Sequence, residues 1–198
     1  MTLKSHSCLL HDFSGSGIIG SMKRFDPVYS DVRKSIINLI TDPEITSIID
    51  ELFLDDAVDF IEEMPASVVK RVLAAATPDR RELINQFLQY PDDSAGSIMT
   101  IEYVDLRIGM TVADAFTRIR STGTNKETIY TCYVTDNARK LLGLVTARTL
   151  FLSPKESLLE DVMESNVVFA RTHDDQEGLI NSFKKYGFLA MPVVDSED

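Results

Sequence analysis

The apolar residues between positions 42 and 88 recur at the spacing of amphipathic helices. A first helix is predicted by four side chains that follow the spacing i, i+3, i+4, i+7: Ile45, Ile48, Ile49 and Leu52. Three more groups predict three more short helices: Leu54, Val58 and Ile61; Val68, Val69, Val72 and Leu73; and Leu83, Ile84, Phe87 and Leu88. Prolines stand where new helices begin, at Pro43, Pro65 and Pro78, because a first turn needs no proline N–H. Short helices with brief connections are typical of stacked helical hairpins.

After Gly96 the pattern changes to short strands that alternate with helices. The stretches "TIYTCYVTD" (128–136) and "KLLGLVT" (140–146) predict two strands around a turn. An amphipathic helix over residues 112–119 and an apolar stretch at Ile101–Leu106 precede them, and another helix is predicted from Thr146 to Leu152. The segment "YPDDSAGSIMT" (90–100) separates this mixed half from the helical half.

The same order restarts at residue 163, which indicates an internal duplication. "IMTIEYVDLRIGMTVADAF" aligns with "VMESNVVFARTHDDQEGLI" when Met99 is placed on Met163, and "CYVTD" (132–136) later aligns with "MPVVD" (191–195). Such units bury their sheets against one another, because each is too small to be stable alone. The second copy has no counterpart of "NARKLLGLVTARTLF" (137–151), so we expect its last strand and helix to be missing.

The sequence therefore predicts an α+β protein, in which a helical-hairpin superhelix is followed by a pair of duplicated units, the second incomplete. The expected parts are a flexible leader (1–40), a helical domain (41–92), a first unit (93–161) and a partial second unit (162–198). The strand around Met191–Asp195 would then lack a neighbour along one edge, and we expect it to be poorly ordered or paired with another chain.

The charge of the chain limits its possible partners. A formal net charge of −11 argues against nucleic-acid binding, which needs a basic face. Cys8 and Cys132 lie far apart, which favours a reducing, cytoplasmic setting, and no apolar run is as long as a membrane span. His173 stands alone in an acidic stretch, and Ser94 lacks a G-x-S-x-G frame and is better explained as a turn cap, so nothing predicts an enzyme.

Residues 41–64 carry nine acidic side chains and no lysine or arginine. Asp55 and Asp59 are four residues apart, hence on one helical face, where like charges repel. One interpretation is a solvated surface, and the other is a surface that attracts cations. Carboxylates that leave water on the ion suit Mg²⁺.

Several segments resemble known families. "GLVTARTL" (143–150) and "MPVVD" resemble a tandem cystathionine-β-synthase (CBS) module. "YPDDSAGSIMT" resembles the junction between the acidic helical N domain and the CBS pair of MgtE-type magnesium transporters, as do "ETIYTCYV" (127–134), "RTHDDQEGL" (171–179) and "YGFLAMPVVD" (186–195). The resemblance covers roughly residues 42–198 and marks "YPDDSAGSIMT" as an interdomain joint.

This resemblance implies the cytosolic, Mg²⁺-sensing regulatory region of a magnesium transporter, on the cytoplasmic side of the cell membrane. It implies a homodimer formed through the CBS domains and a transmembrane pore domain that this chain does not include. When Mg²⁺ is abundant, the ions would bridge acidic surfaces and close the pore as feedback on uptake. The residues implied as metal ligands are Asp55, Asp56, Asp59, Asp175 and Glu177. Gly187 stands where relatives often carry an acidic residue.

An alternative function is adenine-nucleotide sensing by a CBS pair that regulates another protein. Thr149 stands where the CBS pattern has an aspartate that holds the ribose hydroxyls, which weakens this hypothesis. Arg148, Thr149 and Phe188 are the candidate nucleotide contacts. A third interpretation is a purely structural dimerisation module with no ligand.

Overall fold

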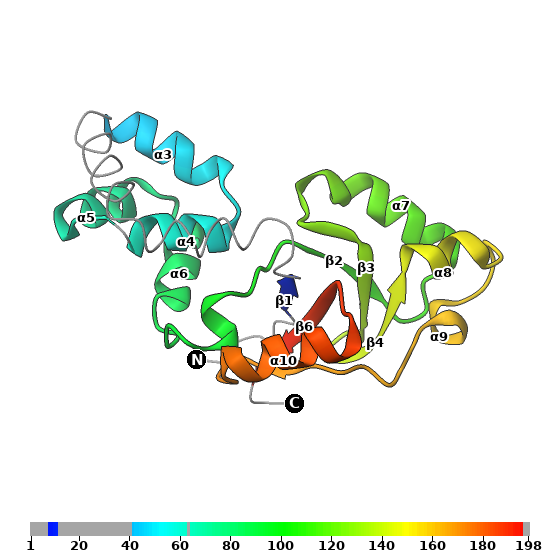
Figure 1. Ribbon diagram of the computed structural model, residues 1–198. Coiled ribbons are helices and arrows are strands. Elements are labelled where there is room, and N and C mark those ends of the chain that lie inside the picture. The colour runs from blue at the N-terminus through cyan, green and yellow to red at the C-terminus, as the bar shows by residue number, and fades with distance from the viewer. Residues whose placement is uncertain (1–7, 12–40, 63, 196–198) are drawn as a thin grey trace. The chain divides into compact units, whose positions relative to one another are not determined.

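The computed structural model describes residues 8–11, 41–62 and 64–195 and divides the chain into two compact units (Figure 1). One unit, here called the helical unit, covers Asp12–Asp92. The other, called the CBS unit, joins Met1–His11 to Asp93–Asp198. The helical unit is therefore inserted, in sequence, between two segments of the CBS unit.

The helical unit contains the four helices that the apolar spacing predicts. They are α3 (Asp42–Glu51), α4 (Leu54–Glu62), α5 (Ala66–Ala75) and α6 (Pro78–Phe87). Helix α3 packs against α5, and α4 packs against α6. Their apolar stripes meet in a core whose largest fully buried side chains are those of Ile45, Ile49, Leu54, Ile61 and Ile84. Each such side chain contributes roughly 1.5–3 kcal/mol by leaving water.

Local chemistry fixes the starts of two of these helices. Thr41 and Glu44 form a reciprocal capping box at α3, with Thr41 N–H and Oγ1 donating to Glu44 Oε2 over 2.9 and 2.7 Å. These hydrogen bonds from Thr41 lower the pKa of the Glu44 carboxyl. Thr77 starts α6 by accepting a hydrogen bond from the Arg80 N–H. The carboxylate of Glu44 is therefore engaged in a helix cap.

Two arginines of α6 satisfy the carboxyl ends of other helices. Arg80 Nη2 donates to the carbonyls of Ile49 and Leu52 at the end of α3, both over 2.7 Å. Arg81 Nη2 donates to the carbonyls of Ala74 and Ala76 at the end of α5, over 3.1 and 3.0 Å. Helix ends leave such carbonyls without intrahelical partners, and a cation there also complements the helix dipole.

In the CBS unit, the first sheet has the strand order β2-β3-β4 and matches the predicted elements. Its strands are β2 (Tyr103–Arg107), β3 (Thr128–Thr135) and β4 (Leu141–Thr146), with β2 parallel and β4 antiparallel to β3. Helices α7 (Val112–Thr122) and α8 (Ala147–Leu152) pack on this sheet over a shared core. A capping box of Thr111 and Asp114 starts α7.

The second sheet repeats this arrangement with a strand from the other end of the sequence. Its order is β1-β6-β5, with β5 (Ala170–Arg171) parallel and β1 (Cys8–His11) antiparallel to β6 (Ala190–Val194). Helix α10 (Gln176–Tyr186) lies between β5 and β6 in sequence. Helix α9 (Leu159–Val162) precedes β5 and contributes Leu159 to the core of the first sheet. The expectation that β6 lacks a neighbour along one edge is wrong, because β1 pairs with it. Four residues set aside as leader thus belong to the fold.

Replacing Arg80 tests how strongly α6 holds the end of α3. Arg80→Met should lower the free energy of unfolding by about 1.5–3 kcal/mol, because it leaves two carbonyls without their charged donor. Chemical unfolding followed by circular dichroism measures the change. Lys70→Met is the matched control, since Lys70 is exposed on α5. Equal stability of the two variants would contradict this account of Arg80.

Candidate functional site

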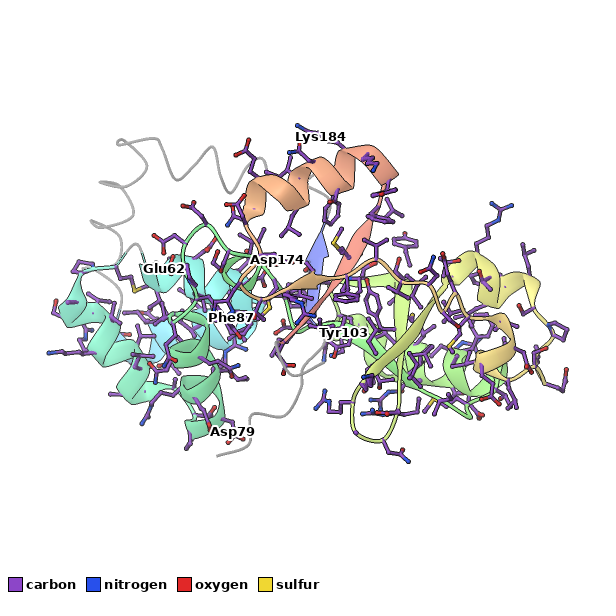
Figure 2. The ribbon with its side chains drawn as sticks, turned by 90° about the horizontal axis from the view of Figure 1, so that it is seen from below. Glu62, Asp79, Phe87, Tyr103, Asp174 and Lys184 are labelled. Atoms are coloured by element: carbon purple, nitrogen blue, oxygen red, sulfur yellow. The ribbon has the colours of Figure 1, made fainter. Side chains whose placement is uncertain are left out.

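The joint at Asp93–Gly96 lies along the acidic stretch of the second CBS half. Ala95 N–H donates to the Asp174 carbonyl and Gly96 N–H to the Thr172 carbonyl, each over 2.8 Å. In return, Gln176 N–H donates to the Asp93 carbonyl over 2.9 Å. Ser94 and Asp175 face each other across this short antiparallel pairing. Asp174, which is labelled in Figure 2, lies in the segment between β5 and α10. The joint therefore fixes the backbone that carries the acidic side chains.

Two carboxylates of this acidic stretch accept hydrogen bonds from nearby backbone N–H groups. Asp175 begins α10, because its Oδ2 accepts the N–H groups of Glu177 and Gly178 over 3.0 and 3.3 Å. Asp174 Oδ2 accepts the Arg171 N–H over 2.8 Å. Glu177 is exposed in the first turn of α10, where a negative charge complements the helix dipole. Both predicted ligands here are exposed, but Asp175 already uses its Oδ2 atom in the helix cap.

The three predicted ligands of the helical unit lie together on α4. Asp55 and Asp56 occupy its first turn, and Asp59 follows one turn later. Asp56 is exposed, whereas Asp55 and Asp59 are half-buried and the Oδ1 atom of Asp55 is buried. The structure therefore brings these three onto one short helix, with Asp56 the most open to solvent.

The carboxylates that were predicted as metal ligands do not form a preformed metal site. Among residues 8–11, 41–62 and 64–195, no group of three or more histidine, cysteine, aspartate or glutamate side chains could hold a metal ion. Mg²⁺ dehydrates reluctantly and is commonly bound through one or two carboxylates with several retained waters. The carboxylates of α4 and of Glu177 fit an ion bound in that way.

The predicted nucleotide contacts come from separate elements. Arg148 is exposed on α8, and Thr149 is half-buried, with its Oγ1 2.9 Å from Thr146 Oγ1. Phe188 lies between α10 and β6, where it stacks on Tyr186 with ring centroids 5.3 Å apart. The Thr149 hydroxyl therefore forms a hydrogen bond at the start of α8. The exposed Arg148 is accessible to a ligand.

The other candidate groups in the described part of the chain are Cys132, Ser94 and His173. Burial raises the pKa of the Cys132 thiol to about 12, so little of it is the reactive thiolate at neutral pH. The Ser94 side chain is buried and makes no cap hydrogen bond, contrary to the turn cap expected for it. His173 is exposed, with Nδ1 3.1 Å from Thr172 Oγ1.

The capping function of Asp175 was not predicted from the sequence, and Gly187 was interpreted there only as a lost acidic position. An aspartate just before an amphipathic run is a recognised start signal for a helix, so the first function could have been predicted. Gly187 ends α10 with φ +65°, a left-handed conformation that favours glycine. An acidic side chain at position 187 would carry a conformational cost.

Substitutions at Asp175 separate its cap from its charge. Asp175→Ala should lower the free energy of unfolding by about 1 kcal/mol, because two N–H groups of α10 lose their acceptor. Asp175→Asn should cost much less, since an amide oxygen also caps a helix. Thermal or chemical unfolding of both variants is the measurement. If the two variants lost the same stability, the charge of Asp175 would matter rather than its cap.

No helix in the described parts of the chain is both long enough and apolar enough to cross a membrane.

Two family models match the sequence: the MgtE intracellular N domain over residues 23–93 and the CBS domain over residues 95–155. The magnesium transporter MgtE of Thermus thermophilus is 34% identical over 144 residues, which are 73% of this chain and 32% of that protein. The chain spans between 25% and 36% of the length of the curated relatives it matches.

Two solved structures resemble the chain over most of its length. The soluble part of a magnesium transporter matches with a TM-score of 0.83 and 27% identity, covering 91% of this chain and 71% of the other. The cytosolic domain of the Mg²⁺ channel MgtE in complex with ATP matches with a TM-score of 0.81 and 29% identity, covering 90% and 72%. These relatives are transporter domains rather than enzymes. The chain combines an MgtE intracellular N domain with a CBS region and is homologous to the cytosolic part of the MgtE magnesium transporters.

Proposed function

We propose that this chain is the Mg²⁺-sensing regulatory region of a magnesium transporter, placed on the cytoplasmic side of the membrane. The observation that carries the proposal is the likeness to MgtE proteins, which extends over both units and the joint between them. The pore would belong to a transmembrane domain of the same transporter. The chain itself would report the cytoplasmic Mg²⁺ concentration to that domain.

Charge provides the sensing mechanism. Residues 41–64 carry nine carboxylates and no basic side chain, and the CBS unit adds the stretch at Asp174–Glu177. At low Mg²⁺ these like charges repel, which favours separated acidic surfaces. Mg²⁺ ions with part of their water shell would bridge carboxylates of the two stretches. We assign the ion contacts to Asp55, Asp56 and Asp59 on one side and to Asp175 and Glu177 on the other.

Feedback on uptake follows from differential affinity. An ion shifts a conformational equilibrium only by as much as it binds one state more tightly than the other. Several weak sites acting together sum their preferences for the compact state. In the transporter, the compact state would hold the pore closed, so abundant Mg²⁺ would limit its own entry.

We also propose that the chain forms a homodimer through its CBS domains. Phe151 and Leu152 at the end of α8 are each 76% exposed, and Phe151 contacts Phe116 of α7 with ring centroids 5.2 Å apart. These two exposed apolar side chains of α8, beside the half-buried Phe116, support an interface there. Sedimentation equilibrium of Phe151→Ser should show weaker association than the parent, and unchanged association would contradict this interface.

Adenine-nucleotide sensing is the second candidate, favoured by the ATP complex of the similar MgtE domain. The exposed Arg148 could contact phosphates, whereas Thr149 lacks the paired acceptors of a carboxylate. Calorimetry with ATP or AMP, with and without Mg²⁺, distinguishes the two functions. Nucleotide binding without any Mg²⁺ response would favour this second function, and a response to neither ligand would favour a purely structural dimerisation module.

Removing charge from α4 tests the metal-bridging mechanism. Millimolar Mg²⁺ at constant ionic strength should raise the melting temperature of the parent chain and lower its radius of gyration. A ligand that binds only the folded state adds about 2.7 kcal/mol at a hundred times its dissociation constant. Asp55→Asn with Asp59→Asn should weaken both responses, because two ion contacts lose their charge. Thermal melts and small-angle scattering are the measurements.

The control variant removes two charges elsewhere. Glu160→Gln with Asp161→Asn changes exposed residues of α9 outside both acidic stretches and should keep the full Mg²⁺ response. An equal loss in both double variants would mean that Mg²⁺ acts by general screening. A full Mg²⁺ response in the α4 double variant would contradict ion contacts at Asp55 and Asp59.

A further inference from the structure

In each half of the CBS unit, the start of one helix is paired with a chain segment from elsewhere in the unit. Placing Met99 on Met163 also places Thr111 on Asp175, and these two residues are the N-caps of α7 and α10. The segment opposite Asp175 is the joint, which leads into the first half. The segment opposite Thr111 covers residues 155–159, here called the linker, which lead into the second half. Each helix start is therefore paired with the segment that leads into the other half.

The linker is held at the start of α7 by backbone groups. Three hydrogen bonds connect the two: Val112 N–H donates to the Ser157 carbonyl over 2.9 Å, Ala113 N–H to the Lys155 carbonyl over 3.0 Å, and Leu159 N–H to the Met110 carbonyl over 2.9 Å. The first-turn N–H groups of a helix have no partner within the helix, so the linker carbonyls satisfy two of them. Val112 is fully buried and apolar, so its side chain adds no hydrogen bond to the linker.

The joint is held at the start of α10 by a similar backbone pairing. Gln176 is the first residue of α10, as Val112 is of α7, and its N–H donates to the Asp93 carbonyl over 2.9 Å. The difference lies in the side chain, since Gln176 carries an amide where Val112 carries two methyl groups. An amide side chain can both donate and accept hydrogen bonds. The two helix starts therefore differ in what they can offer to the segment beside them.

The side-chain amide of Gln176 donates to the joint. Its Nε2 atom lies 3.2 Å from Ser97 Oγ and 3.4 Å from the Ser94 carbonyl oxygen. Ser97 Oγ in turn donates to that same carbonyl over 2.9 Å, so the amide, the hydroxyl and the carbonyl form one closed hydrogen-bonded group. Gln176 is half-buried, which limits the access of competing water. The second half therefore holds the joint through a side chain as well as through its backbone.

We propose that Gln176 is a positioning residue that couples the acidic stretch to the joint. It stands between Asp175 and Glu177, to which the proposed function assigns ion contacts, so this inference rests on that function. An ion held by those two carboxylates would restrict the first turn of α10 and, through Gln176, the joint. The joint would in turn hold the carboxylates in the geometry that the ion prefers, because coupling between two sites is reciprocal. The linker, which faces Val112 instead, would not take part.

Replacing the amide tests its contact with the joint in the absence of Mg²⁺. Gln176→Met keeps the length of the side chain and removes its hydrogen-bonding groups. It should accelerate hydrogen exchange at the Ala95 and Gly96 amides, which bond to the second half, by about tenfold or more. Asn181→Leu is the matched control, because Asn181 is exposed on the same helix, and it should leave these amides unchanged. Equal exchange in the two variants, or equal acceleration at the Val112 amide, would overturn the proposal.

A Mg²⁺ titration separates the coupling from a merely structural contact and from the proposed function itself. In the parent chain, millimolar Mg²⁺ should increase the protection of the joint amides and shift the Glu177 amide signal. In Gln176→Met the shift at Glu177 should remain, whereas the increase at the joint should be lost. An equal increase at the joint in both proteins would overturn the coupling. If neither signal of the parent responded, the proposed Mg²⁺ sensing would be contradicted, and the exchange difference without Mg²⁺ would still decide whether Gln176 positions the joint.

Discussion

Three backbone hydrogen bonds connect the joint to the second half of the CBS unit. The position of the acidic stretch in this unit depends on them. They link the Asp93–Gly96 segment to residues Thr172–Gln176 over 2.8–2.9 Å. Through them, the segment that leaves the helical unit and the start of α10 share one short antiparallel pairing. The acidic stretch is consequently held on a fixed backbone beside the chain segment that follows the helical unit. A shift of either segment would disturb the other, so the proposed sensing at the acidic stretch would be coupled mechanically to the joint.

The same carboxylates serve the fold and the proposed sensing mechanism. Asp175 caps α10, and Asp55 and Asp56 stand in the first turn of α4, where negative charge is favourable. Helix starts thus hold several like charges in place despite their mutual repulsion. Mg²⁺ would relieve a repulsion that the helix starts sustain, and weak binding at each carboxylate would still favour the compact state when several contacts form together.

Local periodicity predicted most of the fold, whereas long-range pairing lay outside its reach. The apolar spacing predicted helices α3 to α6, and the internal duplication predicted two similar sheets. Both predictions rest on patterns that are repeated over many residues. The pairing of Cys8–His11 with β6 could not be predicted from the sequence, since four residues do not specify which distant strand they pair with. The acidic stretches were visible as charge, but the cap at Asp175 and the backbone links of the joint depend on three-dimensional contacts.

Paramagnetic relaxation with Mn²⁺ as a substitute for Mg²⁺ tests the central claim most directly. Amide signals of an isotope-labelled chain would be followed as Mn²⁺ is added and then displaced by excess Mg²⁺. The account predicts selective broadening at the amides of residues 54–60 and 174–178, reversed by Mg²⁺. Uniform broadening over the exposed acidic residues, or broadening that Mg²⁺ does not reverse, would contradict metal sensing by these carboxylates.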